Sequence, residues 1–270
     1  MQITFIGGGN MAAALISGIV RQAGSGATIH VVDRNPEALE RLAQQYGVRT
    51  ATAIDAQVAQ SEVVVLAIKP QQMREVAAEL APHLSRQLVL SIAAGIRSSD
   101  LSRWLGGYDA IVRTMPNTPA LIGMGVTGLA AQPGVSQAQR LQADTVMRAV
   151  GKTVWLDDES QIDPVTAVSG SGPAYVFFFL EAMQEAASQM GLSAEQGREL
   201  ALATFTGAAQ LAAQSDEPVE VLRQRVTSKG GTTYAALQSM EAAEVKARFK
   251  TAIRAAEQRA GELAQEFGRA

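Results

Sequence analysis

The sequence has no cysteine among its 270 residues. This absence excludes disulfide bonds, thiolate nucleophiles and cysteine-ligated metal centres, and nothing else in the sequence leads us to expect a metal site. Because no disulfide calls for an oxidising compartment, the expected location of the protein is the reducing cytoplasm.

Long apolar runs and an excess of basic residues are also missing. The most apolar run after the N-terminus, Ala174 to Leu180, is too short to cross a membrane. The N-terminal sequence MQITFIGGGN lacks the basic start and long apolar stretch of a signal peptide. The net charge of −3 and a pI near 5.5 give no sign of the clustered basic face that nucleic-acid binding requires. We therefore expect neither a membrane nor a nucleic acid as a partner.

The composition allows a well-packed core, since 47% of the residues are hydrophobic and only 18% are charged. In the first half, short apolar runs alternate with amphipathic stretches, which predicts a parallel sheet with helical crossovers. The expected strands are 3–6, 28–32, 62–68, 88–92 and 110–113, with two further strands at the sheet edge, 126–130 and 153–156, and the expected helices are 10–23, 36–46 and 73–80.

The character of the sequence changes near residues 157–160, after which only helical patterns remain. Ser193 and Gln196 form the pattern of a capping box at a helix start. The predicted organisation is an α/β Rossmann-like domain over residues 1–160 and an all-helical domain over residues 161–270. So many apolar helix faces, including three consecutive phenylalanines at 177–179, predict burial either in the core or against another subunit.

A glycine-rich turn follows the first predicted strand and opens the first predicted helix. The residues Gly7-Gly8-Gly9-Asn10-Met11-Ala12 match the pattern G-x-G-x-x-G/A. In that pattern the first glycine permits a tight turn, the second lets the backbone approach a pyrophosphate, and the last small residue lets the helix pack closely on the strand. The turn therefore predicts dinucleotide binding, and the alternative is a glycine-rich turn without a ligand.

Two charged residues follow the second predicted strand and favour different dinucleotides. Asp33 lies 21 residues after Ala12, where a carboxylate binds the ribose 2′-hydroxyl of NAD. The neighbouring Arg34 could instead pair with the 2′-phosphate of NADP. We expect NADPH as the cofactor, with NADH as the alternative.

Further cofactor contacts are expected where later strands end, because ligands of this fold lie beyond the carboxyl ends of the strands. Ala67-Ile68-Lys69-Pro70 follows one strand, and Ala93 follows the next, where small residues leave room for a nicotinamide ring. The expected cofactor-binding residues are Gly7, Gly8, Gly9, Asn10, Met11, Ala12, Asp33, Arg34, Ala67, Ile68, Lys69, Pro70, Ala93 and Asn117.

Three other segments are rich in glycine, serine, threonine and proline without resembling linkers. They are residues 113–119 (RTMPNTP), 169–174 (SGSGPA) and 228–233 (SKGGTT). Such loops present backbone N–H groups and hydroxyls to an anion such as a small carboxylate. Helix capping and tight turns are the alternative explanation.

Taken in order, IGGGNMA, AIKP, SIAAG, MPNTPA, SGSGPAY and GGTT closely resemble the pyrroline-5-carboxylate reductase family. One departure is Lys229, where the family commonly has proline. The resemblance implies hydride transfer from NADPH or NADH to the C=N carbon of 1-pyrroline-5-carboxylate, giving L-proline in the last step of its biosynthesis. It also implies a homodimer or larger homo-oligomer formed through the helical domain.

The resemblance further implies a set of substrate-binding residues, with Thr233 as the hydroxyl nearest the imine nitrogen and the candidate catalytic proton donor. These substrate-binding residues are Ser171, Ser228, Gly230, Gly231, Thr232 and Thr233.

Two other functions compete with this interpretation. A β-hydroxyacid dehydrogenase shares the two-domain plan, but the stretch GPAYVFFFLEAMQEAA lacks the asparagine and lysine that such enzymes use there. A nucleotide-binding protein without turnover is the other alternative, and measurement of turnover separates it from an enzyme.

Overall fold

The computed structural model describes residues 1–269. The chain forms two compact units, one of Met1–Ser171 with the C-terminal stretch from Ala256, and one of Gly172–Ala255. The expected boundary was near residue 160. The first unit extends beyond it because residues 159–171 and the end of the last helix pack with the sheet-containing unit.

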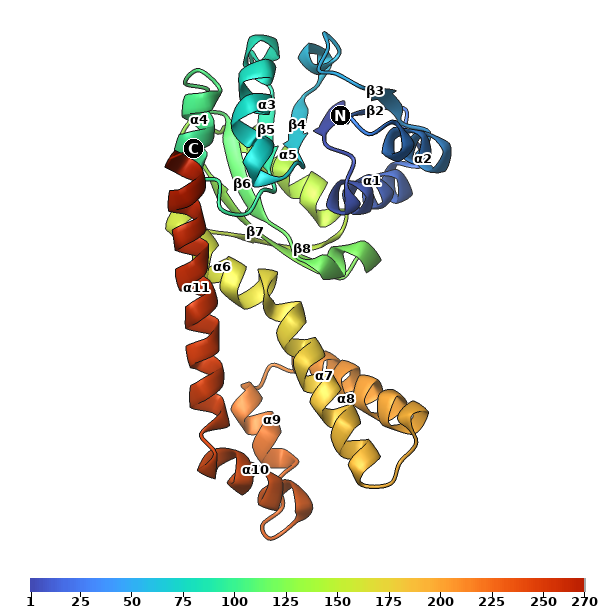
Figure 1. Cartoon of the computed structure of the whole chain (residues 1–270), viewed down its shortest axis with the longest axis vertical. Helices are drawn as coiled ribbons and strands as arrows, with labels where there is room; N and C mark the ends of the chain where they lie inside the picture. The colour runs from blue at the N-terminus through green and yellow to red at the C-terminus, as the bar shows by residue number, and fades with distance from the viewer. Residues whose placement is uncertain (270) are drawn as a thin grey trace. The chain divides into compact units, whose positions relative to one another are not determined.

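The first unit contains one sheet of eight strands in the order β3-β2-β1-β4-β5-β6-β7-β8 (Figure 1). The strands are β1 (Ile3–Ile6), β2 (Ile29–Val32), β3 (Arg49–Ala51), β4 (Val63–Leu66), β5 (Leu88–Ser91), β6 (Ile111–Met115), β7 (Gly125–Ala131) and β8 (Gly151–Trp155). Strands β1 to β6 pair in parallel, whereas β7 runs antiparallel to β6. The parallel arrangement predicted for the central strands is therefore confirmed, and the two predicted edge strands are present with β7 reversing the direction.

Helices cover both faces of this sheet, which explains why its central strands are apolar throughout. Alternate residues of β4 enter different clusters: Val65 packs in the cluster that includes Leu15, and Leu66 in the cluster that includes Met73. The helices of this unit are α1 (Asn10–Ala23), α2 (Pro36–Tyr46), α3 (Met73–Leu80), α4 (Ser98–Trp104), α5 (Gln137–Arg148) and α6 (Ile162–Val165), followed by a π-helical segment, Thr166–Gly170. The predicted helices 10–23, 36–46 and 73–80 thus have the bounds expected from the sequence.

The sheet has a switch point between β1 and β4. From β1 the chain proceeds outward to β2 and β3, and then it returns to the other side of β1 to form β4. In such sheets a crevice opens at the carboxyl ends of the two strands on either side of the switch point, and ligands bind there. The glycine turn after β1 and the residues after β4 therefore lie at the expected ligand position.

The second unit is helical. Its helices are α7 (Gly172–Gln189), α8 (Ala194–Gln214), α9 (Val219–Arg225), α10 (Thr232–Ala242) and the first part of α11 (Val245–Arg269). The capping box predicted at Ser193 and Gln196 is present at the start of α8. Phe179 of α7 contacts Phe249 of α11 edge to face, with ring centroids 5.5 Å apart.

Two of the three consecutive phenylalanines are not buried within the chain. Phe177 and Phe178 are 64% and 66% exposed, whereas Phe179 is partly buried. Burial in the core of a single subunit is therefore wrong for Phe177 and Phe178. Among residues 1–269, no helix is both long and apolar enough to cross a membrane.

Candidate active site

The turn after β1 requires glycine at its first position. Gly7 has a φ of 104°, and a Cβ atom there would lie 2.4 Å from the carbonyl oxygen of Ala67. Its N–H donates to the carbonyl of Val32, 2.7 Å away. The turn is thus pressed against the end of β4, at the switch point of the sheet.

The space around the second conserved glycine of the motif, Gly9, is open. A Cβ atom on Gly9 would meet no atom within 4 Å, although the backbone at Gly9 has an ordinary φ of −72°. Gly9 is the N-cap of α1, and no side chain of the described residues caps this helix start. The first N–H groups of α1, beginning at Asn10, are therefore available to an anion, and Ala12 is buried where the helix meets the sheet.

This combination fits a dinucleotide. The pyrophosphate needs close approach to the backbone and unpaired N–H groups, and the turn with the start of α1 offers both. A side chain at position 9 would extend into open space beside the turn, where the G-x-G-x-x-G/A pattern expects a pyrophosphate.

Asp33 is fixed between this turn and the start of α2. Its Oδ2 atom accepts a hydrogen bond from the backbone N–H of Gly8 at 2.6 Å, and its Oδ1 atom accepts one from Asn35 at 2.8 Å. Asn35 in turn caps α2 by accepting from the N–H groups of Glu37 and Ala38. The carboxylate expected to bind a ribose is thus held in place beside the glycine turn.

A cleft beside Asp33 extends from the glycine turn to α3. Arg34 lines this cleft and forms ion pairs with Glu75 and Glu79 of α3, at 2.7 and 3.4 Å. The residues that line the cleft are Ile6, Gly7, Val32, Asp33, Arg34, Thr52, Ala53, Ile54, Ile68, Gln72, Val76 and Glu79.

Eight of these twelve lining residues are not among the site residues expected from the sequence, and two of the eight, Ile6 and Val32, are the last residues of β1 and β2. Thr52 to Ile54 follow β3, a short strand that the hydrophobic pattern did not reveal. Gln72, Val76 and Glu79 have the spacing of one helix face, and this spacing is the signal that could have placed them together.

The other residues expected near the cofactor have varied surroundings. Ile68 lines the cleft, Lys69 is exposed, and Pro70 begins a short 3₁₀ turn that leads into α3. Ala93 is buried, with its side chain in the apolar cluster between the sheet and helices α3 and α4. Ala93 therefore contributes to core packing at the end of β5.

The side chain of Asn117 is engaged at both ends. Its Oδ1 atom accepts a hydrogen bond from Val126 N–H at 2.9 Å, and its Nδ2 atom donates to the carbonyl of Ser169 at 3.2 Å. Asn117 thus links β7 to the π-helical segment. A π-helical turn is common at functional sites, and this one leads directly into Ser171, whose N–H donates to the Thr166 carbonyl at 2.8 Å.

The SKGGTT segment of the helical unit forms a tight turn and then a helix start. The N–H of Gly231 donates to the carbonyl of Ser228 at 3.0 Å, and Gly230 has a φ of 75°. Positive φ at the third residue of such a turn favours glycine, and proline is common at the second residue, the position that Lys229 occupies. The departure from the family pattern therefore falls at a position where proline pre-sets φ but is not required.

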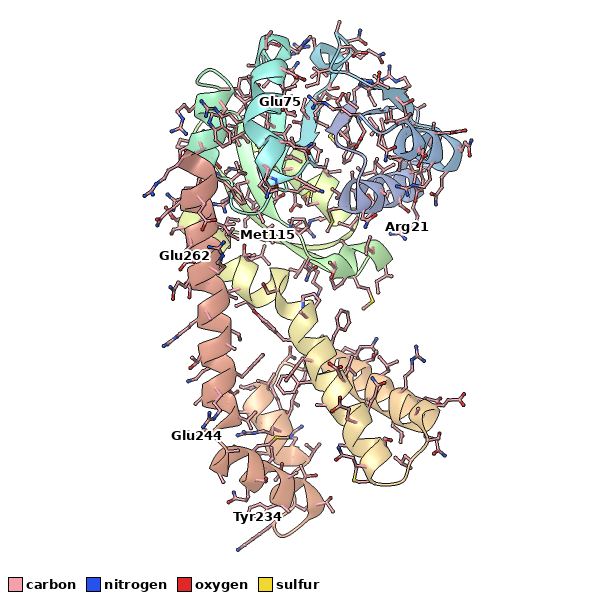
Figure 2. All side chains as sticks on the ribbon, in the orientation of Figure 1. Arg21, Glu75, Met115, Tyr234, Glu244 and Glu262 are labelled. Atoms are coloured by element: carbon pink, nitrogen blue, oxygen red, sulfur yellow. The ribbon has the colours of Figure 1, made fainter. Side chains whose placement is uncertain are left out.

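Gly231 is the N-cap of α10, and no side chain of the described residues caps it. Thr232 and Thr233 are the first two residues of this helix and are exposed, next to Tyr234, which is labelled in Figure 2. Unpaired N–H groups and two hydroxyls at a helix start suit a small carboxylate.

Two protein families match separate parts of the chain. The family described as "NADP oxidoreductase coenzyme F420-dependent" matches residues 2–95, and "Pyrroline-5-carboxylate reductase dimerisation" matches residues 159–263. With the fold, these matches define an oxidoreductase that has an N-terminal Rossmann-like domain followed by a helical dimerisation domain.

Comparison with known proteins narrows this class. A pyrroline-5-carboxylate reductase of Pseudomonas aeruginosa is 48% identical, over 99% of this chain and 98% of the relative. The structure of a pyrroline-5-carboxylate reductase from Coxiella burnetii is similar with a TM-score of 0.92 and 41% identity, covering 97% of this chain and 98% of that one. A Plasmodium falciparum pyrroline carboxylate reductase with NADP bound has a TM-score of 0.87 at 27% identity, with 98% of each chain covered. The chain belongs to the pyrroline-5-carboxylate reductase family.

Proposed function

We propose that this protein reduces 1-pyrroline-5-carboxylate to L-proline with a reduced nicotinamide dinucleotide. The observation that supports this most directly is the pair of uncapped helix starts, each preceded by a glycine turn. One, at Gly9, suits a pyrophosphate, and the other, at Gly231, suits a small carboxylate. A chain with both sites has the binding groups that an imino-acid reductase needs.

The chemistry divides between the cofactor and the protein. The bound cofactor supplies a hydride for the C=N carbon of the imine. The chain binds the phosphates at the start of α1 and a ribose at Asp33, and it binds the substrate carboxylate at Ser228, Gly230, Gly231 and Thr232, with Ser171 as a further substrate contact. The imine nitrogen gains one proton during the reduction, and the hydroxyl of Thr233 is the candidate donor or relay.

NADPH is the cofactor that we propose, with NADH as the alternative. Arg34 gives the cleft beside Asp33 a positively charged group for a 2′-phosphate. The relative from Plasmodium falciparum was solved with NADP bound, which supports the same choice. The further cofactor contacts in this proposal are the backbones of Gly8, Met11, residues 67–70, Ala93 and Asn117.

We also propose a homodimer or larger homo-oligomer that forms through the helical unit and acts in the cytoplasm. Phe177, Phe178, Met190 and Leu211 are each more than half exposed in this unit. Apolar side chains of this size are seldom left in water over a large area, and a second copy of the chain would cover them.

The test is the loss of absorbance of the reduced nicotinamide when 1-pyrroline-5-carboxylate is added, with NADPH and NADH in parallel. Turnover with either cofactor is the expected result. A folded protein that binds the dinucleotide but does not oxidise it with this imine would contradict the proposal and favour the binding-protein alternative.

A further inference from the structure

Arg34 is bound by two carboxylates from a helix that is distant in sequence. Its Nη2 atom donates to Glu75 Oε1 at 2.7 Å and to Glu79 Oε1 at 3.4 Å. Glu75 and Glu79 are four residues apart in α3, so they lie on the same face of that helix (Figure 2 labels Glu75). All three side chains are at least half exposed to solvent.

This arrangement reverses the charge that Arg34 alone would give to the cleft. One guanidinium faces two carboxylates, and a third carboxylate, that of Asp33, lines the same cleft with Glu79. A 2′-phosphate that binds Arg34 must therefore compete with Glu75 and Glu79 and remain close to their negative charges. A ribose with a free 2′-hydroxyl does not compete with the glutamates for Arg34 and is not repelled by them, because it is neutral. Asp33 can accept a hydrogen bond from its hydroxyl.

We propose that Glu75 and Glu79 are specificity-determining residues that reduce the preference of this cleft for a 2′-phosphate and thereby keep NADH competitive with NADPH. They act through Arg34, which they hold and neutralise. This inference rests on the proposed function only for the class of cofactor, since it concerns the adenosine end of the dinucleotide and not the imine.

The opposite role for the glutamates is also testable. If they served to orient Arg34 toward the phosphate, their removal would weaken binding of a 2′-phosphate. The two roles therefore predict changes of opposite sign in the same measurement.

The experiment is isothermal titration calorimetry of the full chain with adenosine 2′,5′-bisphosphate and with AMP, which differ only in the 2′-phosphate. The variants are Glu75→Gln, Glu79→Gln and the double variant, each with and without Arg34→Met. Glu40→Gln, on the exposed surface of α2, removes the same charge away from Arg34 and is the matched control.

We expect the double variant to bind the bisphosphate about fivefold more tightly, the order of magnitude that two exposed ion pairs allow. Its affinity for AMP should change by less than about twofold. The gain should be smaller in each single variant, absent in Glu40→Gln, and lost when Arg34 is methionine.

Several results would overturn the inference. A weaker affinity for the bisphosphate would show that the glutamates orient Arg34, and an unchanged affinity would show that they have no role. An equal gain for both ligands, or a gain that survives Arg34→Met, would show a general effect of charge. If the wild-type protein bound neither ligand, the proposed dinucleotide site itself would fail, and this outcome differs from all of the others.

Discussion

The backbone N–H of Gly8 donates a hydrogen bond to the Oδ2 atom of Asp33, with 2.6 Å between the two atoms. Gly8 belongs to the glycine turn after β1, and Asp33 directly follows the neighbouring strand β2. The carboxylate that we propose as the ribose ligand therefore also fixes the turn that we propose for the pyrophosphate. A change in the position of the Asp33 carboxylate should therefore also shift the glycine turn.

Replacing Asp33 with alanine should weaken binding of NADH and NADPH together, by about tenfold or more. The change removes the acceptor of two charge-assisted hydrogen bonds, one from Gly8 in the glycine turn and one from Asn35 at the start of α2. Hydrogen bonds to a charged group contribute about 1.5–3 kcal/mol each to stability. Asp33→Asn retains a carbonyl oxygen and should lose less. Titration of both cofactors measures this, and a loss confined to NADH would show that Asp33 acts only on the ribose.

Substitutions at Gly7 and Gly9 should have different effects, although both glycines belong to the same motif. Gly7→Ala places a side chain at positive φ and 2.4 Å from a backbone oxygen. The positive φ alone costs about 1–2 kcal/mol. The melting temperature should fall by roughly 2–4 °C for each kcal/mol lost.

Gly9→Ala should instead leave the melting temperature of the apo protein unchanged and lower its affinity for the dinucleotide. Its Cβ meets no atom within 4 Å, so the cost appears only when the ligand must occupy that space. Thermal melts with and without NADPH distinguish the two glycines. Equal melting temperatures for both apo variants would contradict the packing of Gly7 against Ala67.

Thr233→Ala should lower kcat/KM for the imine by at least about tenfold, because a positioned proton donor is lost. Thr233→Ser retains the hydroxyl and should recover most of the activity. Thr251→Ala, on the exposed surface of α11, is the matched control and should behave as the wild type. Steady-state kinetics at saturating cofactor test this, and a wild-type value for Thr233→Ala removes the hydroxyl from the mechanism.

His30 should make the protein less stable in mild acid. It is buried in β2, and burial lowers its pKa below the ordinary value of 6.5, with Arg49 adding to this shift and Asp55 opposing it. Below about pH 6.5 the unfolded state binds a proton that the folded state resists, so stability falls as the pH falls, by up to about 1.4 kcal/mol per pH unit.

His30→Asn removes this titration, so its unfolding free energy should fall less between pH 7 and pH 5 than that of the wild type. Urea unfolding at several pH values measures the two slopes. Equal slopes would show that His30 does not titrate differently in the folded and unfolded states.

Local patterns in the sequence predicted much of the fold because they report on neighbouring residues. The glycine turn indicated where α1 begins, and the apolar run of β4 indicated a strand covered on both faces. Strand β3 was not predicted because its three residues are largely exposed and therefore lack an apolar pattern. The direction of β7 could not be predicted, since hydrophobic alternation is the same for parallel and antiparallel strands.

The candidate site was predictable only in part, for a related reason. The glycine turn is a local pattern, and so its position was visible in the sequence. The ion pair of Arg34 with Glu75 joins residues 41 positions apart, and the two hydrogen bonds of the Asn117 side chain depend on how β7 and the π-helical segment fold back. Contacts of this kind depend on the tertiary structure and have no signal in a single sequence.

The most direct test of the proposed activity follows the transferred hydrogen itself. The protein would be incubated with 1-pyrroline-5-carboxylate and NADPH that carries deuterium at the transferable C4 position, and the product would be analysed by mass spectrometry and NMR. Direct hydride transfer to the imine should give proline that carries one deuterium atom on its δ carbon, the former imine carbon. Unlabelled proline, or oxidation of the cofactor without formation of proline, would contradict direct hydride transfer to the imine.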